Sequence, residues 1–519
     1  MTDPNLHSGV RALLAAFTSA PPDRRVAEFQ RLTEAVWHGG TLTDDAVAAV
    51  AELRTTLEQV PAAQQGYLLV LLGLLVEAEY PATDGEIYTA VRDGMEQYLR
   101  LARDLTGAEP LTFAALYLLG HFPADRERIL DAVRNIELEP DDQTRLDRCL
   151  QELDYDDPDI GRAWPSPWEW AVTEQEREFD REWIAELSRE QVTRTWQWDT
   201  RSVYAYMGAK AYWAVQHGMP TDTAKNVSPE VVTASSAQEL ATAAFDLHLD
   251  ALRCPRCGGR LKAATDRFGC RECGAEYRFA RGILDLSQRT RPGTSLSETP
   301  EDVQKDVLQK AAAITGIGFH YENGMRPSFL RVMGMNWNAA VTPDDEDGYL
   351  ATHSGSPSGT LVDVGAGAGR WTGVLAEAVG ARHVLALDLS EAVLLDLRTR
   401  LPEVAAVRAS AVELPFADAS LDGINCWNAL QALPDAEQAL REIGRCLRPG
   451  GLLTMMTFVW APDPIYRHFQ RSHHFPARPD GFPLFELADV RTWLDRAGLV
   501  IRHEATPGTF FLVTAERPA

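Results

Sequence analysis

The chain has 519 residues, more than one hydrophobic core usually holds, so we expect two or more folding units. Its residues are 45% hydrophobic and 24% charged, which excludes a largely disordered chain. The formal net charge of -25 repels phosphate backbones and disfavours a broad surface for nucleic acid. The start shows no signal-peptide profile and the longest apolar run, residues 67–76, is too short for a membrane span. We therefore expect a cytoplasmic protein.

Charge is distributed unevenly along the chain. Residues 1–250 hold 43 acidic and 21 basic side chains, a net of -22. Residues 251–300 hold 5 acidic and 10 basic side chains, a net of +5, and residues 301–519 hold 27 and 19, a net of -8. Three different balances predict three modules.

Residues 1–245 are predicted to be a helical array. Segments such as residues 46–60 and 112–122 repeat apolar residues at spacings of three and four, with proline or glycine between segments. Helices of about 10–18 residues joined by short connections are typical of an α-solenoid. In helix length the region loosely resembles HEAT-type repeats.

Tryptophan and acidic residues gather at the end of this region. Seven of the 13 tryptophans lie between residues 164 and 213, and residues 151–200 hold 14 acidic against 5 basic side chains. The tryptophans fill helical layers in one interpretation, with the carboxylates in solvent. In the other they form an aromatic, acidic groove that binds a cationic or peptide ligand, or a protein partner.

Two Cys-x-x-Cys pairs, each followed by glycine, lie within residues 250–290: Cys254 with Cys257, and Cys270 with Cys273. Four thiolates can hold one Zn²⁺ tetrahedrally at ~2.3 Å, and four protein ligands leave no open position for a substrate. We expect a structural zinc ribbon. The segment resembles the zinc ribbon at the start of bacterial ribosomal RNA guanine methyltransferases, and the related zinc-ribbon activator subunit of eukaryotic methyltransferases.

A short apolar strand, residues 360–364, runs directly into a loop with three glycines and then a helix. Such a loop directs backbone amides and the positive helix end at a ligand, although dinucleotide enzymes use one too. Nineteen residues after Gly369, a second apolar strand ends in Asp388, whose carboxylate can accept from both hydroxyls of a ribose. Strands and helices then alternate, which predicts an α/β, doubly wound parallel sheet.

Four motifs carry a resemblance: DVGAGAGRWT, LALDLS, ELPFADASLD and LRPGGLL, in this order and spacing. Together they resemble a class I S-adenosylmethionine-dependent methyltransferase over residues 318–519, in the style of small-molecule and quinone methyltransferases, after a linker at residues 291–317. The resemblance implies S-adenosyl-L-methionine as cofactor. By that likeness its contacts are Asp363, Gly365, Gly367 and Gly369 at the methionine end, Asp388 at the ribose, Leu389, Ala411 and Val412 at the adenine, and Trp427 with Asn428 near the sulfonium.

The sequence departs from the family pattern at two places. Ser410 stands where the family often has an aspartate that reads the adenine amino group. Residues 430–435 read LQALPD where relatives often read LHHLPD, so no histidine base is expected there. A degenerate fold that binds no cofactor is the alternative, against which stand the intact glycine loop and Asp388.

Methyl transfer aligns an acceptor with a sulfonium methyl and needs a base only where the acceptor carries a proton. Candidate bases lie in two segments outside the motifs. They are His320 and Tyr321 before the sheet, and Tyr466, His468, His473 and His474 in an insertion where this fold places substrate-covering elements. These histidines either lie on a solvated helix or approach substrate, and we hypothesise that His473 or His474 faces substrate.

Three functions remain open. We favour a methyltransferase acting on a small molecule or peptide of secondary metabolism, with the helical array recruiting substrate. An RNA methyltransferase is supported by the ribbon and its +5 charge, but the -22 of the array opposes it. A protein-directed or non-catalytic binding module is the third. The acceptor atom and the oligomeric state leave no signature in the sequence.

Overall fold

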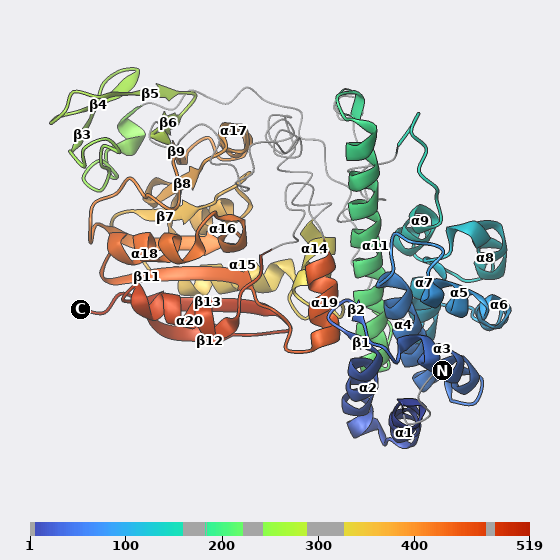
Figure 1. Cartoon of the computed structure of the whole chain (residues 1–519). Helices are drawn as coiled ribbons and strands as arrows, with labels where there is room; N and C mark the ends of the chain where they lie inside the picture. Colours follow the sequence, from blue (N-terminus) through green and yellow to red (C-terminus); the bar gives the residue numbers. More distant parts are fainter. Residues whose placement is uncertain (1–5, 159–181, 183, 222–241, 288–325, 474–482) are drawn as a thin grey trace. The chain divides into compact units, whose positions relative to one another are not determined.

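The computed structural model describes residues 6–158, 182, 184–221, 242–287, 326–473 and 483–519. The chain forms two compact units (Figure 1). The helical unit comprises Met1–Ala224 and Ala461–Phe482, and the sheet unit comprises Lys225–Trp460 and Pro483–Ala519. In the described part of the chain, no helix combines the length and apolar character that crossing a membrane requires.

The helical unit confirms the predicted helices of the N-terminal region. Proline occupies the first turn of several of them, where its missing N–H costs no hydrogen bond. The helices are α1 (Leu6–Ser19), α2 (Pro22–Val36), α3 (Ala46–Leu57), α4 (Ala62–Glu77), α5 (Glu86–Arg92), α6 (Met95–Arg103), α7 (Pro110–Leu119), α8 (Arg126–Val133), α9 (Pro140–Cys149), α11 (Arg189–His217) and α19 (Pro464–Ser472). A two-stranded hairpin, β1 (Trp37–His38) with β2 (Thr41–Leu42), follows α2. A solenoid arrangement stays a prediction.

Helix α4 is the centre of this unit, because it is apolar on every side and almost entirely buried. It packs against α7 and α11. The approach to α7 is close, since a Cβ added at Gly73 would lie 2.4 Å from Cε1 of Tyr117. Helix α11 has 29 residues, begins with a capping box formed by Ser188 and Gln191, and ends at Gly218 in the left-handed conformation.

Helix α19 comes from the C-terminal half of the chain but belongs to the helical unit, where it packs on α11 (Figure 1). Its Tyr466 and Phe469 are fully buried, and a Cβ added at Gly208 of α11 would lie 2.2 Å from Cε1 of Phe469. Asp463 caps the helix and accepts hydrogen bonds from the side chains of three helical-unit residues. The donors are Gln30 at 2.7 Å, Tyr212 at 2.8 Å and Gln216 at 3.0 Å.

The sheet unit contains an 11-stranded mixed sheet of order β12-β13-β11-β10-β7-β8-β9-β6-β5-β4-β3. The strands are β3 (Leu261–Ala263), β4 (Arg267–Cys270), β5 (Glu276–Ala280), β6 (Ile283–Asp285), β7 (Leu361–Val364), β8 (Val384–Asp388), β9 (Ala405–Arg408), β10 (Leu421–Trp427), β11 (Leu447–Phe458), β12 (Val500–Ala505) and β13 (Phe510–Glu516). Strands β9, β8, β7, β10 and β11 are parallel, as predicted for the cofactor fold. Strand β6 adds a parallel strand beside β9, and β13 and β12 extend the sheet antiparallel. The helices are α14 (Arg326–Met333), α15 (Pro343–His353), α16 (Arg370–Val379), α17 (Glu391–Arg400), α18 (Ala436–Cys446) and α20 (Leu487–Arg496).

The cysteine-bearing hairpins are continuous with this sheet. Strand β6 pairs in parallel with β9, Leu284 opposite Val407, and so covers an edge that would otherwise present unpaired backbone groups. Phe268 and Tyr277 of the hairpins share one apolar core with the central strands. The segment predicted as a separate ribbon is therefore built into the sheet unit.

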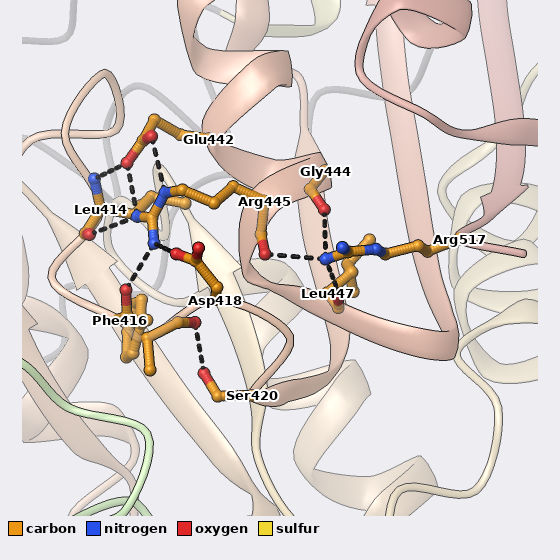
Figure 2. Close-up of polar contacts among 10 residues, drawn as sticks. Leu414, Phe416, Asp418, Ser420, Glu442, Gly444, Arg445, Leu447 and Arg517 are labelled. Atoms are coloured by element: carbon orange, nitrogen blue, oxygen red, sulfur yellow. Dashed lines mark hydrogen bonds and ion pairs between the residues drawn. The ribbon is translucent and has the colours of Figure 1, made fainter. Parts of the chain in front are cut away.

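Two guanidinium groups fix the loop between β9 and β10 and the start of β11 (Figure 2). Arg445 of α18 donates to the carbonyl oxygens of Leu414 at 3.0 Å and Phe416 at 2.7 Å. Glu442 holds Arg445 by an ion pair of 2.7 Å and accepts from the N–H of Leu414 at 2.9 Å. Arg517 donates to the carbonyl oxygens of Gly444, Arg445 and Leu447. The predicted adenine-side loop is thus anchored to α18.

Candidate functional site

The glycine loop lies between β7 and α16, at the carboxyl edge of the parallel strands. Its three glycines, Gly365, Gly367 and Gly369, have φ of 72°, 53° and 92°, a region that side chains rarely adopt. At Gly365 an added Cβ would also meet Cβ of Ala429 at 2.5 Å. The loop therefore requires glycine both for conformation and for close approach to the end of β10.

Asp363, in β7, is buried and satisfied by the protein itself. Its carboxylate accepts from the hydroxyl of Thr372 and from Nδ2 of Asn425, the latter at 2.7 Å. Burial raises the pKa of Asp363 to about 6, although these two hydrogen bonds oppose the rise. Because Thr372 is in the first turn of α16, Asp363 fixes where that helix begins relative to β7. We assign it the positioning of the loop.

Asp388 ends β8 beside the glycine loop. Its Oδ2 accepts from the N–H of Gly367 at 3.1 Å and its Oδ1 accepts from the N–H of Ser390 at 2.9 Å. Burial raises the pKa of Asp388, and the backbone hydrogen bonds oppose the rise. A carboxylate accepts about four hydrogen bonds, so Asp388 keeps capacity for hydroxyl donors such as those of a ribose.

The predicted adenine-side residues lie on two loops of the sheet unit. Leu389 directly follows Asp388, and Ala411 is buried in the loop that Arg445 anchors. Val412 donates its N–H to Oγ of Ser410 at 3.4 Å, and its carbonyl accepts from Gln438 at 3.2 Å. The serine that replaces the family's aspartate thus caps its own loop.

Trp427 and Asn428 lie at the end of β10. Trp427 is buried, and its Nε1 donates to Oε1 of Glu346 at 3.1 Å. Asn428 has φ of 55°, uncommon for a residue with a side chain, and Gln431 donates to its Oδ1 at 2.9 Å. Such backbone strain is concentrated at functional sites.

Two charged residues that the sequence reading missed complete this edge of the sheet unit. Arg326 of α14 and Glu346 of α15 form a buried ion pair, and Glu346 is only 1% exposed. The guanidinium carbon of Arg326 lies 4.6 Å from the ring centroid of Trp371 in α16. Neither residue belongs to a sequence motif. To predict them, one would need to know which helices pack near the glycine loop, and no local pattern gives this.

The six predicted bases fall into two groups. His320, Tyr321 and His474 lie outside the described residues. The other three belong to the helical unit, where Tyr466 and His473 are buried and His468 is largely so. The picture of histidines on a solvated helix is wrong for them, because α19 packs into a core. That His473 faces substrate stays a prediction.

His468 has a defined environment within the helical unit. Its Nε2 lies 3.2 Å from Oε1 of Glu77, which is buried, and its ring meets that of Trp37 edge-on at 4.8 Å. The hydroxyl of Tyr117 donates to Oε2 of Glu77 at 2.6 Å. Burial raises the pKa of Glu77, but the nearby imidazoles of His121 and His468 outweigh it, so the pKa lies well below its usual value.

The tryptophans described in α11 contact side chains of the same unit. The guanidinium of Arg148 stacks on Trp196 at 3.5 Å from the ring centroid, and His217 stacks on Trp213 at 4.2 Å. Both rings are buried, as the core-filling interpretation expects. Trp164, Trp168, Trp170 and Trp183 lie outside the described residues.

The four predicted zinc ligands converge. Their sulfur atoms all lie within 4.8 Å of one another, with 3.7 Å between Cys254 and Cys273 and 3.5 Å between Cys257 and Cys270. A tetrahedral site with bonds of ~2.3 Å places its sulfurs about 3.8 Å apart, so the donor set fits Zn²⁺. The hydroxyl of Tyr277 lies 2.9 Å from the sulfur of Cys254 and supports that ligand from outside the set.

Comparison with known proteins agrees with this geometry. Residues 362–455 match the family model described as "Methyltransferase domain". The chain is 25% identical over 298 residues to an uncharacterized chloroplastic methyltransferase of Arabidopsis thaliana, covering 52% of this chain and 79% of that one. It is 38% identical over 180 residues to a malonyl-[acyl-carrier protein] O-methyltransferase of Methylococcus capsulatus, covering 31% and 65%.

Among solved structures, an S-adenosylmethionine-dependent methyltransferase from Mesorhizobium loti is similar, at 24% identity and a TM-score of 0.28. The match covers 32% of this chain and 93% of that one. The glycine loop, the carboxylate at the end of β8 and the family match all fall on one stretch of the sheet unit. Residues 362–455 therefore match a methyltransferase domain, within the sheet unit.

Proposed function

We propose that the protein is an S-adenosyl-L-methionine-dependent methyltransferase that acts on a small molecule. The observation that carries this proposal is the placement of Asp388 against the glycine loop. Its carboxylate accepts from Gly367 and keeps capacity for a sugar diol, and α16, whose first-turn N–H groups have no acceptor within the helix, begins directly after the loop. When bound, the cofactor supplies an electrophilic methyl group.

The residues of the chain bind, orient and exclude water in this proposal. Asp388 holds the ribose, and the loop over Gly365 to Gly369 holds the methionine end. Leu389, Ala411 and Val412 flank the adenine. Trp427, buried and fixed by Glu346, closes the floor near the reacting methyl, where a dry environment strengthens electrostatic control. Alignment is the main contribution that such a displacement needs.

The names of relatives support a small acceptor. One acts on a malonyl group carried by a protein, and a 33% identical stretch of 119 residues occurs in a demethylmenaquinone methyltransferase of Lysinibacillus sphaericus. We extend the proposal to secondary metabolism, with the helical unit recruiting the acceptor. In an alternative form of this proposal, the helical unit binds a protein or peptide partner, and the methyl acceptor is a peptide.

Modification of RNA is less well supported, because several basic residues of the cysteine-bearing segment form ion pairs within the sheet unit. Arg267 pairs with Asp266 and Glu276, at 3.0 and 3.1 Å. Arg281 pairs with Glu391 at 2.7 Å. Because these guanidinium groups are neutralised by carboxylates, the segment should attract RNA phosphates less strongly than its net charge of +5 suggests.

Calorimetric titration with S-adenosylhomocysteine tests the proposal. We expect the full chain to bind it, and Asp388→Ala to weaken binding at least tenfold, because hydrogen bonds to a charged group are lost. Asp489→Asn, on the exposed face of α20, is the matched control and should bind as the wild type does. Equal affinity of Asp388→Ala and the wild type would refute the assignment of Asp388 to the ribose.

A further inference from the structure

Two hydrogen-bond donors near the glycine loop are buried and have no acceptor among the residues that the structure describes. They are Nε of Arg326 and Nε1 of Trp371. Arg326 is 7% exposed and Trp371 is 8% exposed, so solvent does not satisfy them. Buried donors are almost always paired in folded proteins, and an orphan pair therefore needs an explanation.

The two donors belong to one place in the sheet unit. The guanidinium carbon of Arg326 lies 4.6 Å from the centroid of the Trp371 ring. Trp371 is the second residue of α16, two residues after Gly369, so the positive end of a ten-residue helix adjoins it. The donors thus adjoin the predicted methionine end of the cofactor site.

Glu346 and its neighbour Asp347 both take part in ion pairs, although Oδ1 of Asp347 receives no hydrogen bond of good geometry within the described residues. Glu346 accepts from Nη2 of Arg326 and from Nε1 of Trp427. Asp347 pairs with Arg370 at 2.8 Å. These two ion pairs balance the local charge, which disfavours a dianion such as a phosphate monoester. The two donors still require hydrogen-bond acceptors, and the ligand group that supplies them should carry no more than one negative charge.

We propose that Arg326 and Trp371 form a carboxylate-binding subsite, an inference that rests on the proposed methyltransferase function. A carboxylate offers two coplanar oxygens, one for the edge of a guanidinium and one for an indole N–H. The carboxylate comes either from the methionine part of the cofactor or from the acceptor. Both sources share the same recognition chemistry, and binding experiments separate them.

The test compares two nucleosides that differ in the methionine part. S-adenosylhomocysteine carries the carboxylate, and 5′-methylthioadenosine lacks it. Calorimetry on the full chain is done with the wild type, Arg326→Lys, which keeps a cation for Glu346 but loses Nε, and Trp371→Phe, which loses only the indole N–H. Trp493→Phe, a half-buried ring on α20, is the matched control. The indole ¹⁵N–¹H resonance of Trp371, assigned from its absence in Trp371→Phe, reports the contact directly.

We expect Trp371→Phe and Arg326→Lys each to weaken S-adenosylhomocysteine binding about tenfold and leave 5′-methylthioadenosine unchanged, with the indole resonance shifting only for the former. That result identifies the cofactor carboxylate. If both nucleosides behave alike, a saturable shift of the resonance by acetate added to protein saturated with 5′-methylthioadenosine identifies an acceptor carboxylate. No shift with either, together with unchanged affinities, would overturn the subsite but not the function. Failure of S-adenosylhomocysteine to bind the wild type would overturn the function, and acetate alone would then decide the subsite.

Discussion

At the scale of single residues, the two aspartates near the glycine loop have different hydrogen-bond partners, although both belong to apolar strands. The carboxylate of Asp363 accepts from the side chains of Thr372 and Asn425, whereas that of Asp388 accepts from backbone donors alone within the described residues. Sequence resemblance placed both against the cofactor. The structure gives Asp363 a positioning role through side-chain partners far away in the chain, and the cofactor contacts of both aspartates stay predictions.

The raised pKa of Asp363 makes stability depend on pH. Its folded pKa of about 6 exceeds the ordinary value of 3.8, so the native state binds the proton more tightly than the unfolded state. The contribution to stability is complete below about pH 4 and is lost as pH rises through 6. Over that window we expect the wild type to lose about 2–3 kcal/mol relative to Asp363→Asn, as two pKa units imply. Urea unfolding at pH 4.5 to 7.5 measures the difference, and a constant difference would contradict it.

At the scale of elements, α19 is the main departure from the sequence reading. Its sequence, PIYRHFQRS, places apolar and aromatic residues on one face, and that face fills the core of the helical unit. Local pattern gives the helix but cannot tell which core receives it. The three donors on Asp463 come from residues about 250 to 430 positions away, beyond the reach of any local pattern.

The contact between His468 and Glu77 should hold α19 in place. His468→Ala removes a hydrogen-bond partner of a buried carboxylate, and leaving a buried group without its partner costs about 1–3 kcal/mol. We expect faster amide hydrogen exchange across Pro464–Ser472. His38→Ala, whose side chain is 77% exposed in the same unit, should leave the exchange unchanged. Unaltered protection in His468→Ala would show that apolar packing alone fixes α19.

The cysteine-bearing hairpins should depend on metal. We expect about one Zn²⁺ per chain by elemental analysis, because four thiolates complete a structural site. Removal by a chelator, or Cys270→Ser, should release β6 from β9 and lower the melting temperature of the sheet unit by several degrees. Cys426→Ser, at a buried cysteine outside the cluster, is the control for loss of a thiol. An unchanged melting temperature after zinc removal would show that the apolar core alone retains β6.

At the scale of the whole molecule, what could be predicted followed from contacts that are local in sequence. The glycine loop, the strand ending at Asp388 and the cysteine pairs are short patterns, and the structure has each with the expected geometry. The ion pair of Arg326 with Glu346 and the pairing of β6 with β9 join separate segments of the chain, so no residue spacing in the sequence predicts them. The assignment of residues 461–482 to the helical unit is of the same kind. Topology, rather than composition, determines these features.

The central claim is that a nucleoside lies over the glycine loop with its sugar on Asp388. A crystal structure of the full chain with S-adenosylhomocysteine tests it most directly. The account predicts both ribose hydroxyls within hydrogen-bond distance of the Asp388 carboxylate, and the homocysteine part over Gly365 to Gly369. A nucleoside bound elsewhere, or a loop left without it at saturating concentration, would contradict the account.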